Sequence, residues 1–389
     1  MYVECSLLIG ALARSVANKP LTVPQSVDWD RFLRLCQIHN VGALAYDGLR
    51  KAGVLEATPQ EVQKQLAAEY HTAIFMDSQL DYVKQRLEQK LEKEKIPHIF
   101  LKGASLKYDY PVPALRTMCD LDVLVYAKDF GALAAVAEFL GGTAQHSDGN
   151  HRNYYFAGGV SVEFHPNLLH HDTPVGTGIN PGWQYSRKDP STGAMVLTEE
   201  GFYLNTICHL ANHFVGGGVG VRFVLDVWVN RNLRKPQPDR AFVEKELARF
   251  GLLEFAKNIE ALADTWFGDG PQTPLVEQLG KYILTSGSHG YAGRAMLNAV
   301  AMSPGGNRGS ALMKKAFYSR AEMEDRFPWC KGKPWLLPAA WCTRAFKAVT
   351  KHGHLIRQWG RGTGGVTKEE VQQQRALLAA FGIDVFKNR

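Results

Sequence analysis

The sequence lacks the cysteine patterns that mark disulfide-rich or zinc-binding proteins. Its 389 residues include six cysteines, and no two of them are separated by only two residues: Cys5, Cys36, Cys119, Cys208, Cys330 and Cys342. A secreted disulfide framework or a structural zinc site usually needs cysteines at closer spacing. We therefore expect free thiols in a reducing compartment.

Long apolar segments, internal repeats and low-complexity tracts are also missing. No stretch reaches the roughly 18–20 consecutive apolar residues that a membrane-spanning helix needs. The short apolar run near Met1 is preceded by Glu4, where a secretory signal peptide carries positive charge. These features predict a cytoplasmic protein without a transmembrane segment.

Acidic residues are scarce only near the C-terminal end. The whole chain has a net charge of +7, whereas residues 301–389 contain 16 basic and 6 acidic residues. Between Lys331 and Arg361 the chain has seven basic residues and no acidic one, interleaved with tryptophans. This region could bind an anionic partner such as RNA or a membrane surface, or form an amphipathic segment whose basic face stays in water.

Hydrophobic periodicity divides the chain into four regions. Residues 1–95 and 198–300 show helical spacing of apolar residues, and residues 301–389 form the basic, Trp-rich region. Residues 96–197 alternate short strand patterns with an Ala-rich helix, and Gly158-Gly159 predicts a two-residue hairpin turn. The predicted fold class is α+β, with a small mixed β-sheet core flanked by N-terminal and C-terminal helical regions.

A long helix is predicted between Thr58 and Lys95. It begins with Thr58-Pro59-Gln60-Glu61, which has the pattern of a capping box with proline at the first helical position. We therefore expect Thr58 to cap this helix.

The segment Asp120-Leu121-Asp122 indicates a metal site. On a strand, the period of two places both carboxylates on one face. Two neighbouring anions are costly unless water or a cation neutralises them, and carboxylate ligands suit Mg²⁺ bound together with phosphates. The segment alone also fits a solvated pair of acids in a loop.

Two further segments favour the metal site. Lys102-Gly103-Ala104-Ser105 joins a predicted strand to a helix, where backbone N–H groups and the Ser105 hydroxyl could contact a phosphate. Glu163 lies on a later predicted strand and could bind a metal or accept a proton from an attacking hydroxyl. Together these features describe metal-assisted phosphoryl or nucleotidyl transfer.

The same segments resemble a known family. Leu101 to Leu106, Leu115 to Val125, and Val162 to His165 are similar to the uncharacterised nucleotidyltransferase family of the polymerase-β-type superfamily. The resemblance implies that Asp120 and Asp122 hold Mg²⁺, with Mn²⁺ as an alternative, and that Glu163 is the third carboxylate. It also implies that Lys102, Gly103 and Ser105 contact the triphosphate of an NTP such as ATP.

Other candidate residues leave alternatives open. Arg116 could neutralise the charge of a bound nucleotide or pair with Asp120, and His165 could touch the substrate or be a half-buried strand residue. His209 and His213 have metal-ligand spacing on one helix face, but a packed or hydrogen-bonded pair is favoured over zinc. Asp226 lies in an apolar helix, where an anchoring role, for example toward Arg222, is favoured over a role in the active site.

The sequence thus predicts a Mg²⁺-dependent nucleotidyltransferase. It would transfer a nucleoside monophosphate from an NTP to an unidentified acceptor, which could be a small molecule, a protein or RNA, and release pyrophosphate. A toxin-like transferase that modifies RNA or protein is one alternative. A non-catalytic nucleotide-sensing or RNA-binding protein with a degenerate site is another.

Overall fold

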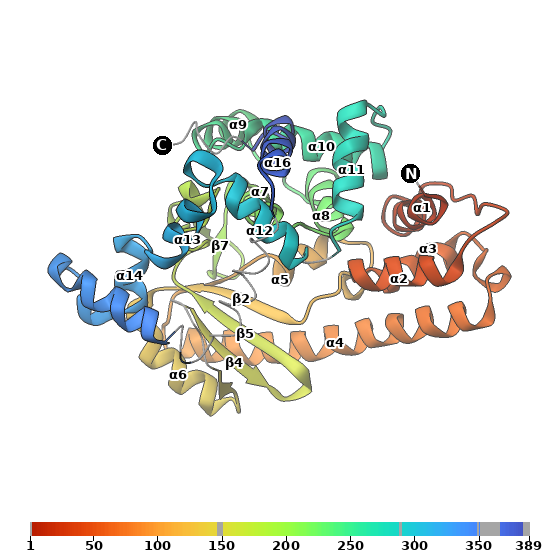
Figure 1. Ribbon diagram of the computed structural model, residues 1–389. Coiled ribbons are helices and arrows are strands. Elements are labelled where there is room, and N and C mark those ends of the chain that lie inside the picture. Colours follow the sequence, from red (N-terminus) through yellow and green to blue (C-terminus); the bar gives the residue numbers. More distant parts are fainter. Residues whose placement is uncertain (1, 146–150, 288–289, 348–349, 351–365, 384–389) are drawn as a thin grey trace.

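A small mixed sheet forms the centre of the computed structural model, which describes residues 2–145, 151–287, 290–347, 350 and 366–383 (Figure 1). Within these residues five strands pair in the order β1-β2-β5-β4-β3. The strands are β1 (His98–Phe100), β2 (Asp120–Val125), β3 (Thr143–Ala144), β4 (Arg152–Phe156) and β5 (Val160–His165). Strands β2 and β5 are parallel and the other neighbours are antiparallel. The predicted α+β class is confirmed.

Alternation of residue types decides which face of the sheet is buried. In β5 the apolar residues Val160, Val162 and Phe164 are buried, whereas Ser161, Glu163 and His165 are partly exposed on the opposite face. The β4–β5 hairpin was predicted correctly, but Phe156 pairs with Val160, so its loop has three residues rather than two.

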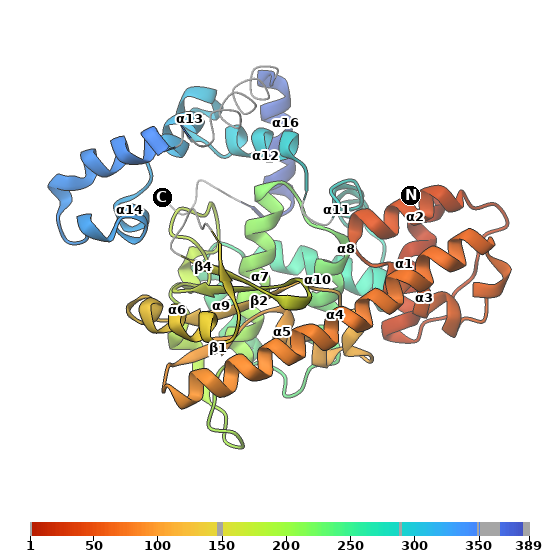
Figure 2. The ribbon, with the colours of Figure 1, turned by 90° about the horizontal axis from the view of Figure 1, so that it is seen from below.

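One long helix supports the apolar face of the sheet. Helix α4 (Gln60–Lys93) runs below the sheet, and α6 (Phe130–Phe139) packs beside it (Figures 1 and 2). Leu80, Leu87 and Leu91 of α4 share a hydrophobic cluster with Val123 and Val162 of the sheet. This packing leaves the polar face of β2 and β5 free for chemistry.

The predicted capping box of this helix is wrong. Pro59 is the N-cap of α4 and makes no side-chain capping bond. The Thr58 hydroxyl instead donates to the Leu55 carbonyl at 2.7 Å, which closes the preceding turn. The Thr58 hydroxyl therefore donates to a nearby backbone carbonyl and does not cap the helix, as the sequence pattern predicts it would.

Helices on the other side of the sheet form the bulk of the molecule. They share one hydrophobic core with the N-terminal helices α1 (Val3–Ala17), α2 (Trp29–His39) and α3 (Gly42–Lys51). The helices above the sheet in Figure 1 are α7 (Glu199–Gly216), α8 (Val221–Asn232), α9 (Arg240–Arg249), α10 (Leu253–Phe267), α11 (Pro274–Leu284), α12 (Ala292–Ala301) and α16 (Lys368–Ala380). No helix in the described ranges is long and apolar enough to cross a membrane.

Two short helices project from this body toward the end of the sheet. Helices α13 (Arg308–Ala316) and α14 (Arg320–Arg326) belong to the basic C-terminal region and lie far from α1–α3 (Figures 1 and 2). Lys351, Arg357, Trp359 and Arg361 of that region lie outside the described residues.

Candidate active site

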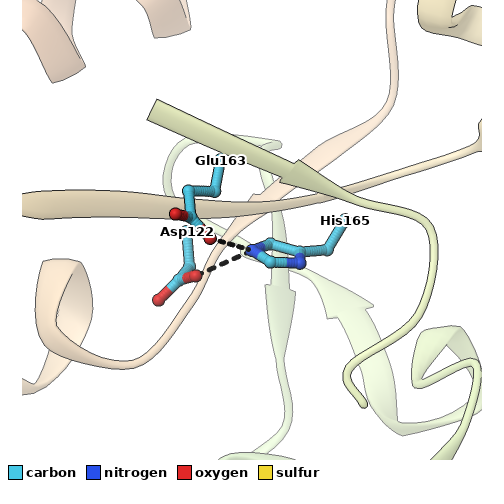
Figure 3. Close-up of side chains that lie close together, drawn as sticks. All are labelled: Asp122, Glu163 and His165. Atoms are coloured by element: carbon cyan, nitrogen blue, oxygen red, sulfur yellow. Dashed lines mark hydrogen bonds and ion pairs between the residues drawn. The ribbon is translucent and has the colours of Figure 1, made fainter. Parts of the chain in front are cut away.

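The register of β2 and β5 brings the predicted acids together. Asp122 lies opposite Glu163, and Asp120 lies opposite Ser161. Because the strands are parallel and in this register, the side chains of Asp122, Glu163 and His165 meet on the polar face of the sheet (Figure 3). One ligand atom from each of these three residues lies within 4.8 Å of the other two.

His165 joins the two carboxylates. Its Nε2 lies 2.8 Å from Asp122 Oδ1 and 3.4 Å from Glu163 Oε2 (Figure 3). Burial alone would lower the pKa of His165, but the hydrogen bonds to Asp122 and Glu163 outweigh burial and raise it. The hydrogen bond from His165 in turn lowers the pKa of Glu163. The site therefore places a proton on Nε2, between two anions.

Lys102 is the second cation at Asp122. Its Nζ lies 3.0 Å from Asp122 Oδ2. Burial by itself raises the pKa of Asp122, but the Lys102 ammonium and the hydrogen bond from His165 hold that pKa well below its usual range. Asp122 is therefore ionised and contacted on both carboxylate oxygens.

Asp120 stands apart from this group. It is not among the three residues whose ligand atoms lie within 4.8 Å of one another. Burial, together with repulsion from Asp122, raises the pKa of Asp120. Of the three acids, Asp120 is therefore the one whose ionised form its surroundings disfavour.

The turn after β1 presents Lys102 in a strained conformation. Lys102 has φ 46° and ψ −120°, a region that residues other than glycine rarely occupy. The next residue begins the short helix α5 (Gly103–Leu106), and the Ser105 hydroxyl donates to the Phe100 carbonyl at 3.2 Å. Lys102 thus faces the acids, while Ser105 bonds to the preceding strand.

Arg116 pairs with Asp226, not with Asp120. Its Nε and Nη2 donate to the two oxygens of Asp226 at 3.0 and 2.8 Å, and the Tyr110 hydroxyl donates to the same carboxylate at 2.7 Å. Any side chain at Gly103 would collide with the Arg116 guanidinium. The pairing of Arg116 with Asp226 is structural, and a nucleotide contact by Arg116 stays a prediction. Asp226 has the favoured anchoring role, with Arg116 rather than Arg222 as its partner.

Further histidines lie near the acids, at positions that no sequence pattern connects with the site. The ring of His151 lies 5.6 Å from those of both His165 and His170, measured between centroids. Burial, reinforced by the charge on His165, lowers the pKa of His151 to about 4. Asn153 Nδ2 donates to Glu163 at 3.3 Å. The Glu163-x-His165 spacing was a usable signal for His165, but nothing local connects His151 or His170 with the site.

His209 and His213 form a hydrogen-bonded pair rather than a metal site. Their Nε2 atoms lie 2.9 Å apart, and the His209 ring stacks on Phe223 of α8 while the His213 ring is tilted against it. Burial, reinforced by the Lys102 ammonium, lowers the pKa of His209 well below its usual range. In the described ranges neither belongs to a group of three potential ligands. The favoured hydrogen-bonded alternative is therefore the arrangement in the structure.

The donor set fits a divalent cation. Asp122 and Glu163 supply oxygen ligands that suit Mg²⁺ or Mn²⁺, and His165, with its proton on Nε2, holds these carboxylates by hydrogen bonds. The carboxylates of Asp120, Asp122 and Glu163 carry three negative charges if all are ionised, against the positive charges of Lys102, Arg222 and a protonated His165. Binding of an anionic triphosphate there requires an additional positive charge, because its oxygens would otherwise repel the acids.

Comparison with known proteins agrees with this chemistry. A family model described as an uncharacterised nucleotidyltransferase matches residues 25–268. This range covers the chain from the loop before α2 to the end of α10, including all the acids and cations of the site. No curated protein and no solved structure matches the chain.

Proposed function

The chain belongs to this uncharacterised nucleotidyltransferase family, and on that premise we propose that it is a metal-dependent enzyme that transfers a nucleoside monophosphate from an NTP. The observation that carries the proposal is the convergence of Asp122, Glu163 and His165 on one face of two parallel strands. Lys102 lies against the same carboxylate cluster and supplies a positive charge for phosphate.

The acids would hold the metal. Asp120, Asp122 and Glu163 would bind Mg²⁺ or Mn²⁺, which when bound would neutralise charge on the triphosphate and polarise the α-phosphate. The raised pKa of Asp120 fits this role, because a cation would favour its ionised form.

Lys102 would change partners when nucleotide binds, whereas His165 would keep its partners. The side chain of Lys102 is 21% exposed, so its ammonium can reach outward to a phosphate oxygen. Gly103 and Ser105, in the turn after β1, would contact the same phosphates. His165 would keep Asp122 and Glu163 oriented through the hydrogen bonds of its ring.

The transfer itself exchanges two phosphorus–oxygen bonds. The acceptor hydroxyl oxygen would form a bond to the α-phosphorus while the bond from that phosphorus to the leaving pyrophosphate oxygen breaks. Glu163 would take the hydroxyl proton, since the hydrogen bond from His165 keeps its carboxylate ionised before the reaction.

Substitution of Asp122 tests this proposal. Asp122→Asn keeps the side-chain shape but removes the charge shared by Lys102 and His165, so we expect pyrophosphate release to fall by at least about 100-fold. Exposed Asp30 provides the matched control, because Asp30→Asn changes the same group away from the site. Undiminished release by a folded Asp122→Asn protein would contradict the proposal. Mg²⁺-dependent NTP binding by the wild type without turnover would instead indicate the nucleotide-sensing alternative.

A further inference from the structure

A pocket of about 450 Å³ lies where the chain leads into β2, and its lining ends at Cys119, one residue before Asp120. Helix α4 forms one wall, the α2–α3 corner forms a second, and residues 114–119, which lead into β2, form the third. Ala68 and Thr72 on α4 line the pocket and are exposed, so a small molecule can reach it from solvent.

The third wall runs directly into the acids. Cys119 lines the pocket, and its carbonyl accepts a hydrogen bond from the Ser161 amide of β5 at 3.2 Å. Asp120 is the next residue, and Asp122 follows about 10 Å along the strand from Cys119. A molecule that fills the pocket therefore ends next to the strand that carries Asp120 and Asp122.

One charge in the pocket is not balanced. Asp77 is paired with Lys107 at 2.7 Å, and Arg116 is paired with Asp226. Glu69 has no ion pair or hydrogen bond within the part of the chain that the structure describes, and burial raises the pKa of its carboxyl group. The pocket thus holds an uncompensated, half-buried carboxylate, which attracts a cation or a hydrogen-bond donor.

About half of the other side chains that line the pocket are apolar. Ala43, Ala73, Met76 and Met118 line the pocket. Such a lining favours an apolar body, with a few polar groups that fix its orientation.

We propose that this pocket holds the acceptor of the transfer reaction, and that the acceptor is a small molecule with an apolar body, a hydroxyl group and a protonated amine opposite Glu69. The proposal rests on the proposed function, because the hydroxyl is assigned as the attacking group.

Two probes of similar shape test the charge preference. We would measure binding of trans-4-aminocyclohexanol and cyclohexane-1,4-diol by ligand-observed NMR, because they differ in one amine. The amine should bind roughly tenfold more tightly to the wild type, and Glu69→Gln should remove this difference. Glu92→Gln, an exposed change on the same helix outside the pocket, should preserve it. An equal preference in the wild type and in Glu69→Gln would overturn the proposal.

Filling the pocket tests the acceptor role. Ala68→Trp should weaken amine binding and lower transfer in the presence of a small-molecule cell extract by about tenfold or more, with Mg²⁺·NTP affinity within about twofold of the wild type. Ile74→Trp, an exposed α4 position outside the pocket, is the control and should change neither. Full transfer by Ala68→Trp would overturn the proposal and leave the proposed function standing. If the wild type does not bind Mg²⁺·NTP, the proposed function is contradicted, whatever binding the two amine and diol probes show.

Discussion

Asp122 is contacted by a cation on each of its two carboxylate oxygens. Lys102 approaches one oxygen at 3.0 Å and His165 the other at 2.8 Å. Two positive partners hold its pKa far below the usual value, so Asp122 is anionic at every physiological pH. Of these two residues, Lys102 is the one that would turn to a nucleotide phosphate in the proposed reaction, while His165 would keep Asp122 oriented.

The sequence was sufficient to predict that Asp122 and Glu163 lie on strands of one sheet, but not which side chains surround them. Strand periodicity correctly placed Glu163 and His165 on one face of a strand, because this period depends only on local backbone geometry. The partner of Arg116 lies 110 residues away on α8, and no local pattern connects them. Contacts of that range depend on how the helices pack.

The buried Arg116–Asp226 pair yields a prediction for stability. Asp226→Asn would leave the Arg116 guanidinium without its counter-ion, and the free energy of unfolding should fall by roughly 3–5 kcal/mol. Urea denaturation measures this change. Asp30→Asn, on an exposed face of α2, should stay within about 0.5 kcal/mol of the wild type. A similarly small effect at Asp226 would show that the pair does not anchor α8.

Among the helices, α2, α8 and α11 meet at one histidine. His39 Nε2 lies 3.3 Å from the Leu284 carbonyl of α11, and the Val221 amide of α8 donates to Nδ1 at 3.4 Å. Helical periodicity predicted helices in these regions but not their junction, because a buried histidine has no periodic signature. Burial lowers the pKa of His39 to about 4.

This junction predicts a pH dependence of stability. Between about pH 6.5 and pH 4 the unfolded chain protonates His39 while the folded chain does not, so stability falls as the pH decreases through this window. His39→Gln should reduce the loss by roughly 3 kcal/mol, measured as urea denaturation at several pH values. His71→Gln, at an exposed position on α4, is the control. Identical pH profiles for the wild type and His39→Gln would contradict the assignment.

At the scale of the whole molecule, the C-terminal region is attached beside the active site. The Glu322 side chain of α14 is buried, pairs with Arg326 at 2.7 Å and accepts the His171 amide at 3.2 Å. Exposed Trp335 and partly exposed Trp329 lie on the same projecting segment. Whether this basic region binds an anionic partner or forms an amphipathic segment with its basic face in water stays a prediction. Residues 301–389 lie outside the range that the family model matches.

The attachment of α14 can be tested by hydrogen exchange. Glu322→Ala removes the carboxylate that joins α14 to the segment after β5, so amides of α14 and of residues 170–173 should exchange faster. Amides of α4 should keep their protection, because α14 packs in a separate small cluster around Met323 and Phe327. Unchanged exchange in both segments would show that other contacts hold α14 in place.

The most direct test of nucleotidyl transfer is to follow which labelled phosphate of an NTP reaches an acceptor. The protein would be incubated with Mg²⁺, a cell extract and NTPs labelled at either the α- or the γ-phosphate. Nucleotidyl transfer by this site predicts label in an acceptor from the α-position and in pyrophosphate from the γ-position, with both lost in Asp122→Asn. Transfer of the γ-label to an acceptor, or α-label transfer that survives Asp122→Asn, would contradict it.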